Sequence, residues 1–331
     1  MVENQTPMIP PRSNPELFGH EAAEAVLATA MASGRLHHAW LITGPEGIGK
    51  ATLAYRFARR LLAGPAADGS LALDPAHPAF RRVAAGSHAD LLSVERAVDE
   101  KTKRRRAEIV VEDARAVSTF LHLTAAEGGW RVVIVDGADA MNRNAANALL
   151  KVLEEPPPRA VLLLLAASPG RLLPTIRSRC RRLALKPLAE GLVERLLRQA
   201  LPELEDPHGV AMLAGGSIGR ALQLAAGEGL ACARLMEEAL AGVTPLRGFA
   251  LADEVVKLED GFGLFMTLLR QRLAERIAAQ GRAGETVTAR PLAASVELWQ
   301  GLWALQAATE GVNLEPRQAL LEAMARLRAL A

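Results

Sequence analysis

The stretch "ITGPEGIGKATLAYRFARRLL", residues 42–62, decides the fold of this chain. Gly44, Gly49 and Lys50 have the spacing of a phosphate-binding loop, G-x-x-x-x-G-K-[ST], and Gly47 lies between them. The apolar run "AWLIT" precedes the loop and a helical pattern follows it. In that context backbone N–H groups and a helix N-terminus can hold phosphate. The residues therefore predict a P-loop that joins a strand to a helix.

The loop departs from the motif at its last position. Ala51 replaces the Ser or Thr whose hydroxyl reaches Mg²⁺, and Thr52 is one residue late, about 100° further around a helix. We expect any contacts to a nucleotide from Gly44, Gly47, Gly49, Lys50 and Thr52. Weak binding of ATP or ADP and a purely structural use of the loop both stay open.

Short apolar runs alternate with helical patterns through the first half of the chain. The runs "AWLIT", "DLLSVE", "WRVVIVD" and "AVLLLLAAS" are bounded by turn residues. This βαβ order predicts a parallel sheet with helices on both faces. Residues 64–90, rich in Gly, Pro and Ala, interrupt the order as an insertion to which we assign no chemistry.

The run "RVVIVD" ends in Asp136, which suits a Walker B strand whose carboxylate holds the metal shell. ATPases of this kind place a Glu directly after that Asp as the base for water, but here the residue is Gly137. Asp139 lies two residues further along. With Ala51, a second catalytic position of the same site is therefore empty.

Helical patterns replace strand signals after Cys180. We predict an α/β P-loop domain at residues 1–187, a small helical lid at 188–230 and an all-α domain at 231–331. The net charge of +2 demands neither nucleic acid nor an acidic membrane as a partner. Two distant cysteines and the absence of a long apolar run predict a cytoplasmic protein with no zinc or other metal site.

Three further stretches carry a resemblance. "NAANALLKVLEEPP" at 144–157, "LLPTIRSRC" at 172–180 and "GGSIGRAL" at 215–222 follow the P-loop in this order. Together the four elements resemble the clamp-loader branch of the AAA+ proteins, over about residues 40 to 222. The Ser-Arg-Cys element beside a damaged loop and Walker B strand is similar to the delta-prime subunits of bacterial DNA polymerase III.

The resemblance implies roles for particular residues. In that family the Ser-Arg-Cys element, here Ser178, Arg179 and Cys180, supplies an arginine finger to a neighbouring subunit. A planar and always charged guanidinium suits this task, because it meets phosphoryl oxygens as their charge shifts. Arg220 matches the sensor-2 arginine that faces the subunit's own nucleotide. The C-terminal helices would form the collar on which the subunits assemble.

The implied function is that of a clamp-loader subunit that hydrolyses no ATP itself. Its partners would be gamma/tau and delta subunits, and through them the sliding clamp and primed DNA. Two alternatives are an active ATPase similar to gamma/tau, and a P-loop kinase for a small molecule. The kinase lacks an evident motif for an acceptor substrate and leaves Ser-Arg-Cys unexplained.

Two features depart from the family or stay unassigned. Many relatives carry a four-cysteine zinc module after the first helix, whereas this chain has no cysteine before Cys180. Ala166 and Ala167 stand where hydrolysing relatives have a polar sensor-1 residue. The basic run "KTKRRR", residues 101–106, fits a solvated hairpin tip, and contact with DNA phosphates is the alternative.

Overall fold

The computed structural model describes residues 9–66, 68–97, 106, 108–127, 129–258, 260–282, 290–312 and 314–330. The chain divides into two compact units, Met1–Ala221 and Leu222–Ala331. Each unit buries apolar side chains of its own.

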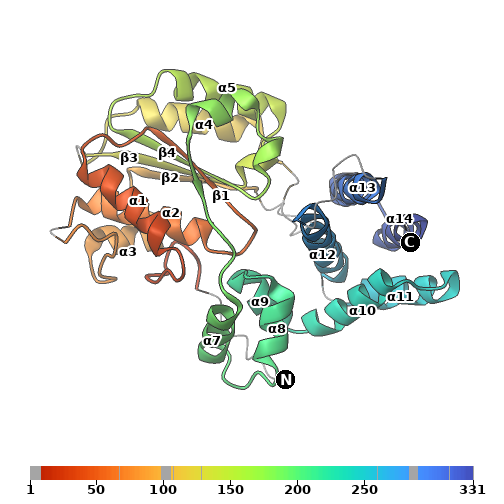
Figure 1. Cartoon of the computed structure of the whole chain (residues 1–331). Helices are drawn as coiled ribbons and strands as arrows, with labels where there is room; N and C mark the ends of the chain where they lie inside the picture. Colours follow the sequence, from red (N-terminus) through yellow and green to blue (C-terminus); the bar gives the residue numbers. More distant parts are fainter. Residues whose placement is uncertain are drawn as a thin grey trace. The chain divides into compact units, whose positions relative to one another are not determined.

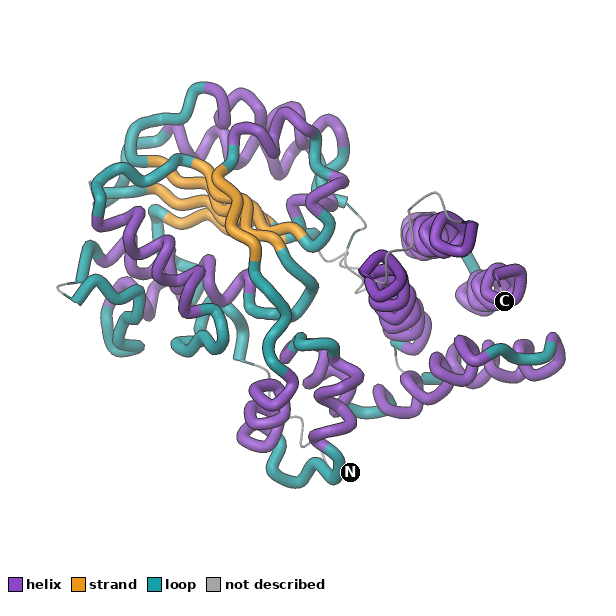
Figure 2. Tube along the Cα trace, viewed as in Figure 1, coloured by secondary structure: helices purple, strands orange, loops and turns teal. Residues whose placement is uncertain are grey.

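Five parallel strands form the centre of the first unit (Figures 1 and 2). Their order in the sheet is β2-β3-β4-β1-β5, so the P-loop strand β1 lies between β4 and β5. The strands are β1 Ala39–Thr43, β2 Leu91–Val94, β3 Arg131–Asp136, β4 Ala160–Ala166 and β5 Arg181–Ala184. Every residue of β4 is buried, as expected for a central strand that is covered on both faces.

Helices cover both faces of this sheet (Figure 1). Helices α1 and α2 share one apolar cluster with β1, β3 and β4, and helices α4 and α5 share a second cluster on the opposite face. These helices are α1 Glu21–Ala32, α2 Lys50–Ala63, α4 Val111–His122 and α5 Arg143–Glu154. The short helix α6, Pro174–Arg179, adds Ile176 to the second cluster. The sheet thus holds its loops between two packed layers.

Smaller elements connect or follow the sheet. They are α3 Pro78–Ala84, the 3₁₀ helices η1 Ala138–Ala140 and η2 Pro169–Arg171, and the helices α7 Glu190–Ala200, α8 Pro207–Ala214 and α9 Ile218–Ala225. Helix α3 lies within the insertion at 64–90 and packs against α2, where Arg59 lies 4.3 Å from the centre of the Phe80 ring. The described part of this insertion therefore adds a packed helix to the first unit.

The second unit contains helices α10 to α14 (Figure 2). They are α10 Gly229–Ala241, α11 Pro245–Lys257, α12 Gly261–Arg282, α13 Arg290–Val312 and α14 Pro316–Leu330. Helix α12 packs against α10 and α13, while α14 packs against α11 and α13. The predicted fold class, a parallel P-loop sheet followed by helices, is confirmed. The division into an α/β domain, a lid and a collar at 187 and 230 stays a prediction.

Four of the five strands agree with the sequence analysis, and one was not predicted. β5 pairs with β1 in parallel, although its sequence "RRLA" has a single buried apolar side chain, Leu183. Residues 101–105 of the basic run lie outside the described residues. Arg106 is described, and its backbone N–H donates to the Ala97 carbonyl at 2.7 Å.

Candidate functional site

The P-loop, residues 44–49, connects the end of β1 to the start of α2. Gly44, Gly47 and Gly49 have φ angles of 147°, 73° and 111°, in the region that side chains rarely adopt. A methyl group on Gly47 would come within 2.5 Å of Ser217 Oγ. The loop therefore requires glycine both for its backbone shape and for the close approach of another segment.

Lys50 turns its ammonium group toward the loop itself. Its Nζ donates to the carbonyl oxygens of Gly44 and Pro45, both at 2.7 Å, and the side chain is buried. Burial lowers the pKa of Lys50, and the nearby carboxylates Glu46 and Asp136 oppose that effect only in part. Carbonyl oxygens of the loop thus bind two of the three N–H donors of the ammonium group that a P-loop normally offers to phosphate.

The start of α9 lies directly on the loop. Ser217 Oγ donates to the Glu46 carbonyl at 2.8 Å, and the Gly219 N–H donates to the Gly47 carbonyl at 2.9 Å. Ser217 is fully buried, and a Cβ on Gly219 would come within 2.8 Å of the Gly47 Cα. The segment "GGSIGR" is therefore bonded to the apex of the P-loop by two hydrogen bonds.

A histidine from the preceding segment binds the other end of the loop. His20 is buried, and its Nε2 lies 2.6 Å from the Ile48 carbonyl, which can only accept. The Gly49 carbonyl accepts from the Leu53 N–H in the first turn of α2. Together with the donors from Lys50, Ser217 and Gly219, these contacts give every carbonyl from Gly44 to Gly49 a partner within the chain.

Asp136 ends β3 beside β4, and Gly137 follows it with a φ of 81°. The position where an ATPase carries its catalytic Glu is therefore held in a left-handed conformation. Asp139 accepts from the backbone N–H groups of Ala167 and Ser168 at 3.1 and 2.6 Å. Its carboxylate caps the turn after β4.

Arg220 and Thr52 complete the residues predicted for nucleotide contact. Arg220 is buried on α9, and its Nη1 lies 3.4 Å from the Ala214 carbonyl. Its backbone N lies 3.1 Å from the position of a Cβ on Gly47, so it borders the loop. Thr52 is half-buried in the first turn of α2, next to Ala51, which packs against the core. The structure thus brings the loop, Asp136 and Arg220 to one region of the first unit.

Arg179 lies near the end of the sheet where the parallel strands begin, opposite the end where the P-loop lies. Arg181, two residues later, pairs with Trp40 near the start of β1, whereas the P-loop follows Thr43 at the end of this strand. Residues 39 and 43 are separated by about 13 Å along a strand. The finger predicted in Ser-Arg-Cys therefore lies at the amino ends of the strands, which we call the amino edge of the sheet. This chain's own P-loop lies at their carboxyl ends.

Two contacts hold the Arg179 guanidinium. Its Nη2 lies 2.8 Å from Glu154 Oε1, and its Nη1 donates to the Thr175 carbonyl at 3.0 Å. Its side chain is 36% exposed, so it can also reach groups outside the chain. Glu154 is the last residue of α5 and Arg179 the last of α6. A cation at the C-terminal ends of helices is favoured by their dipoles.

Ser178 and Cys180 differ in their surroundings. Ser178 is exposed, and its hydroxyl donates to the Thr175 carbonyl at 3.1 Å. Cys180 is buried in the cluster with α5 and β4, and burial raises the pKa of its thiol to about 12. The thiol is thus protonated at neutral pH and packs as an apolar group.

Sequence reasoning did not identify Ser217, His20 or Asp139 as residues that shape the loop region. His20 and Ile48 are 28 residues apart, and Ser217 and Glu46 are 171 apart. No local pattern links such pairs. In the sequence Ser217 is marked only by its place in "GGSIGR", a segment that the resemblance connects with Arg220.

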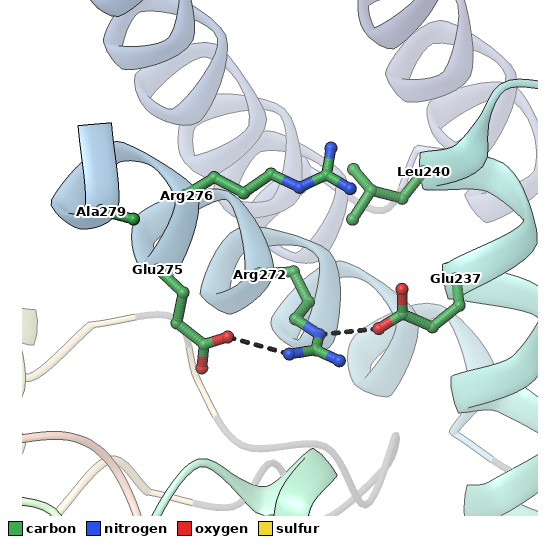
Figure 3. A pocket seen from close by; sticks show the side chains of 6 residues that line it. All are labelled: Glu237, Leu240, Arg272, Glu275, Arg276 and Ala279. Carbon is green, nitrogen blue, oxygen red and sulfur yellow. Dashed lines mark hydrogen bonds and ion pairs between the residues drawn. The ribbon is translucent and has the colours of Figure 1, made fainter. Parts of the chain in front are cut away.

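A pocket of about 340 Å³ lies in the second unit, between α10 and α12 (Figure 3). Arg272, one of the residues that line this pocket, forms ion pairs with Glu237 at 2.7 Å and with Glu275 at 3.1 Å. Figure 3 shows Arg276 extending toward Leu240 beside this bridge. Two arginines and two glutamates balance the charge of the lining, and we assign the pocket no ligand.

Within the described residues there is no group of three or more His, Cys, Asp or Glu side chains that could hold a metal ion. None of the helices in the described ranges is sufficiently long and apolar to span a membrane.

Comparison with known proteins places these features in a family. A family model described as "DNA polymerase III, delta subunit" matches residues 19–189, just over half of the chain. The match includes the P-loop, Asp136 and Arg179, and ends before Arg220.

Two curated relatives agree with this match. The DNA polymerase III subunit delta' of Pseudomonas aeruginosa is 44% identical over 184 residues, which are 54% of this chain and 53% of that protein. The DNA polymerase III subunit tau of Salmonella typhimurium is 29% identical over 259 residues, 74% of this chain and 38% of that protein. The chain thus spans about half of the first relative's length and less of the second's.

Among solved structures, a DNA polymerase III gamma subunit-related protein from Thermotoga maritima aligns with 93% of this chain and 98% of its own. Its sequence identity is 19% and its TM-score is 0.43, so it adds nothing to the assignment. The family model and the delta' relative confirm the resemblance to delta-prime subunits that the sequence motifs indicate. The chain belongs to the DNA polymerase III delta subunit family.

Proposed function

We propose that this chain works as a delta-prime-like subunit of a clamp loader and supplies Arg179 to the ATP site of a neighbouring gamma/tau subunit. In this role it helps to open the sliding clamp and to place it on primed DNA in the cytoplasm. The delta subunit would be a further partner. The chain itself hydrolyses no ATP.

The position of Arg179 carries this proposal. The guanidinium is half-exposed at the amino edge of the sheet, and this chain's own P-loop follows the opposite end of β1. A finger on that edge is poorly placed for its own loop, but it can meet phosphoryl oxygens that another subunit holds. Such an arginine stabilises the charge that develops during phosphoryl transfer.

The P-loop region supports the non-hydrolysing part of the proposal. Ala51 offers no hydroxyl to Mg²⁺, Gly137 offers no carboxylate to water, and Lys50 donates to loop carbonyls. Two of the three N–H donors of the Lys50 ammonium are thus already used within the loop. We therefore assign the loop a structural role, with at most weak binding of ATP or ADP.

The test is a reconstituted complex that contains Arg179→Ala. We expect normal assembly, because the side chain lies outside the core, and a reduced ATPase rate in the presence of clamp and primed DNA. An arginine finger contributes roughly 10³ to 10⁵ in rate at a single site, although a ring with several active sites will show a smaller total loss. Arg179→Lys should rescue poorly, since an ammonium lacks the planar fork.

Arg182→Ala is the matched control, because Arg182 is exposed on the neighbouring strand β5. It should leave ATPase and clamp loading unchanged. Normal clamp loading by an assembled Arg179→Ala complex would remove the role in trans. Steady ATP turnover by the isolated wild-type chain, lost in Lys50→Ala, would instead support an active gamma/tau-like ATPase.

A further inference from the structure

We propose that Glu154 is a positioning residue for Arg179, which orients the guanidinium toward the phosphoryl group of the neighbouring subunit's nucleotide. This inference rests on the proposed function, because it assigns Glu154 a role through the finger. Glu154 lies on α5, in the stretch "LKVLEEPP", and not in the Ser-Arg-Cys element.

The contacts of Arg179 leave part of its guanidinium available. The group has five N–H donors. In the described part of the chain, one donor on Nη2 binds Glu154 Oε1 at 2.8 Å and one on Nη1 binds the Thr175 carbonyl at 3.0 Å, which leaves three. Two contacts fix the plane of the group, while the remaining donors can reach phosphoryl oxygens. Without the contacts to Glu154 and Thr175, the long Arg179 side chain would sample many rotamers.

Glu154 is itself held in place by the packing of α5. The preceding residues Val152 and Leu153 are buried beneath the helix. The Leu153 carbonyl accepts from His38 Nε2 at 3.1 Å, and His38 directly precedes β1. The end of α5 is thus attached to the start of β1. The backbone that carries Glu154 is therefore fixed relative to the sheet, and the carboxylate meets Arg179 from a different helix.

Exposure makes the ion pair suitable for orientation rather than for stability. The side chains of Arg179 and Glu154 are 36% and 50% exposed. Exposed pairs typically change a folding equilibrium by no more than about fivefold. The loss of Glu154 should therefore leave the fold intact, whereas the alignment of a catalytic group can alter a rate by one to two orders of magnitude.

The experiment compares Glu154→Ala, Glu154→Gln and Glu155→Ala in the reconstituted complex with gamma/tau, delta, clamp and primed DNA. Glu155 is the adjacent exposed glutamate and serves as the matched control. We expect Glu154→Ala to lower kcat for ATP about tenfold, with KM within twofold, because positioning acts on the transition state. Glu154→Gln should lower kcat less than Glu154→Ala does, because the amide oxygen of glutamine still accepts from Arg179 Nη2. Glu155→Ala should match the wild type.

A double variant separates this inference from the proposed function. Arg179→Ala with Glu154→Ala should be no slower than Arg179→Ala alone, because Glu154 acts only through the arginine. A further loss in the double variant would overturn the positioning role, as would a wild-type or raised kcat for Glu154→Ala. If Arg179→Ala alone keeps the wild-type rate, the proposed function fails first. If the Glu154 variants keep the wild-type rate and Arg179→Ala does not, the finger role of Arg179 is supported and the positioning role of Glu154 fails.

Discussion

Gly137 illustrates at the scale of one residue why this Walker B region differs from that of an active ATPase. Its φ of 81° belongs to the left-handed region, and a Cβ there would meet nothing within 4 Å. The space would admit a side chain, but the backbone conformation disfavours one. Inserting the missing carboxylate is therefore not a simple repair.

We predict that Gly137→Ala and Gly137→Glu each lower the free energy of unfolding by about 1–2 kcal/mol, the cost of a left-handed L-residue. Gly137→Glu should not produce ATP turnover in the isolated chain, because the hydroxyl after Lys50 is still missing. Denaturant unfolding and a steady-state ATPase assay measure the two effects. Gly129→Ala is the control, since Gly129 also has open space but no positive φ. Turnover by Gly137→Glu, or stability equal to the wild type, would contradict this account.

At this scale the sequence predicted the P-loop itself, but it did not predict the hydrogen bonds that distant residues make to the loop carbonyls. The spacing of Gly44, Gly49 and Lys50 reports a local backbone shape, which neighbouring residues encode. The acceptors of Lys50 and the donor Ser217 depend on how distant segments meet in space. A local sequence pattern does not report which distant segments come into contact.

Among the elements, the central strands were predictable and the edge strand was not. β1, β3 and β4 are almost continuously apolar, because helices cover both of their faces. β5 has one neighbour in the described sheet, and three of its four residues are exposed. Because two of its four residues are charged, β5 lacks the apolar run by which the other strands were identified. The segment 101–105 offered two interpretations, and the described residues test neither.

Helices α7 and α8 make a prediction about pH. His208 Nδ1 on α8 lies 3.1 Å from Glu194 Oε2 on α7, and this hydrogen bond raises the pKa of His208. The stabilisation is complete below the unfolded value of about 6.5 and is lost as the pH rises through the raised folded pKa. An NMR titration of the histidine ring should give a pKa above 6.5.

Glu194→Gln should bring the pKa of His208 back toward its ordinary value. Glu203→Gln is the matched control, because Glu203 is exposed in the connection between the same two helices and is not among the causes of the shift. A wild-type His208 with its ordinary pKa, or an equal change of that pKa in both variants, would show that the Glu194 hydrogen bond does not raise the pKa of His208.

At the scale of the whole molecule, the two units have separate cores. The first unit contains the sheet with its two apolar clusters, and the second buries residues such as Phe265 and Leu302 among its own helices. The sequence predicted the change from strands to helices, since periodicity reports it. It could not show that α7, α8 and the start of α9 belong to the first unit, because that depends on contacts such as Ser217 with Glu46.

We predict that a chain ending at residue 230 folds but does not join the complex. The cut falls in the first residues of α10, after α9, and leaves the apolar clusters of the sheet complete. The collar role that the resemblance implies for the C-terminal helices predicts this loss of assembly. Circular dichroism should show cooperative unfolding, and size-exclusion chromatography with gamma/tau and delta should show no co-elution. Normal co-elution of the shortened chain would refute the collar assignment.

The edge strand β5 also affects how the chain behaves before it meets other subunits. An edge strand has free N–H and C=O groups that can pair with a strand of another molecule and start aggregation. β5 is only four residues long, and Arg181 and Arg182 at its start are both exposed. Short length and positive charge oppose such pairing between copies, which repel each other there. We therefore expect the two arginines, which also made β5 hard to predict from the sequence, to lower the tendency of an unassembled chain to aggregate.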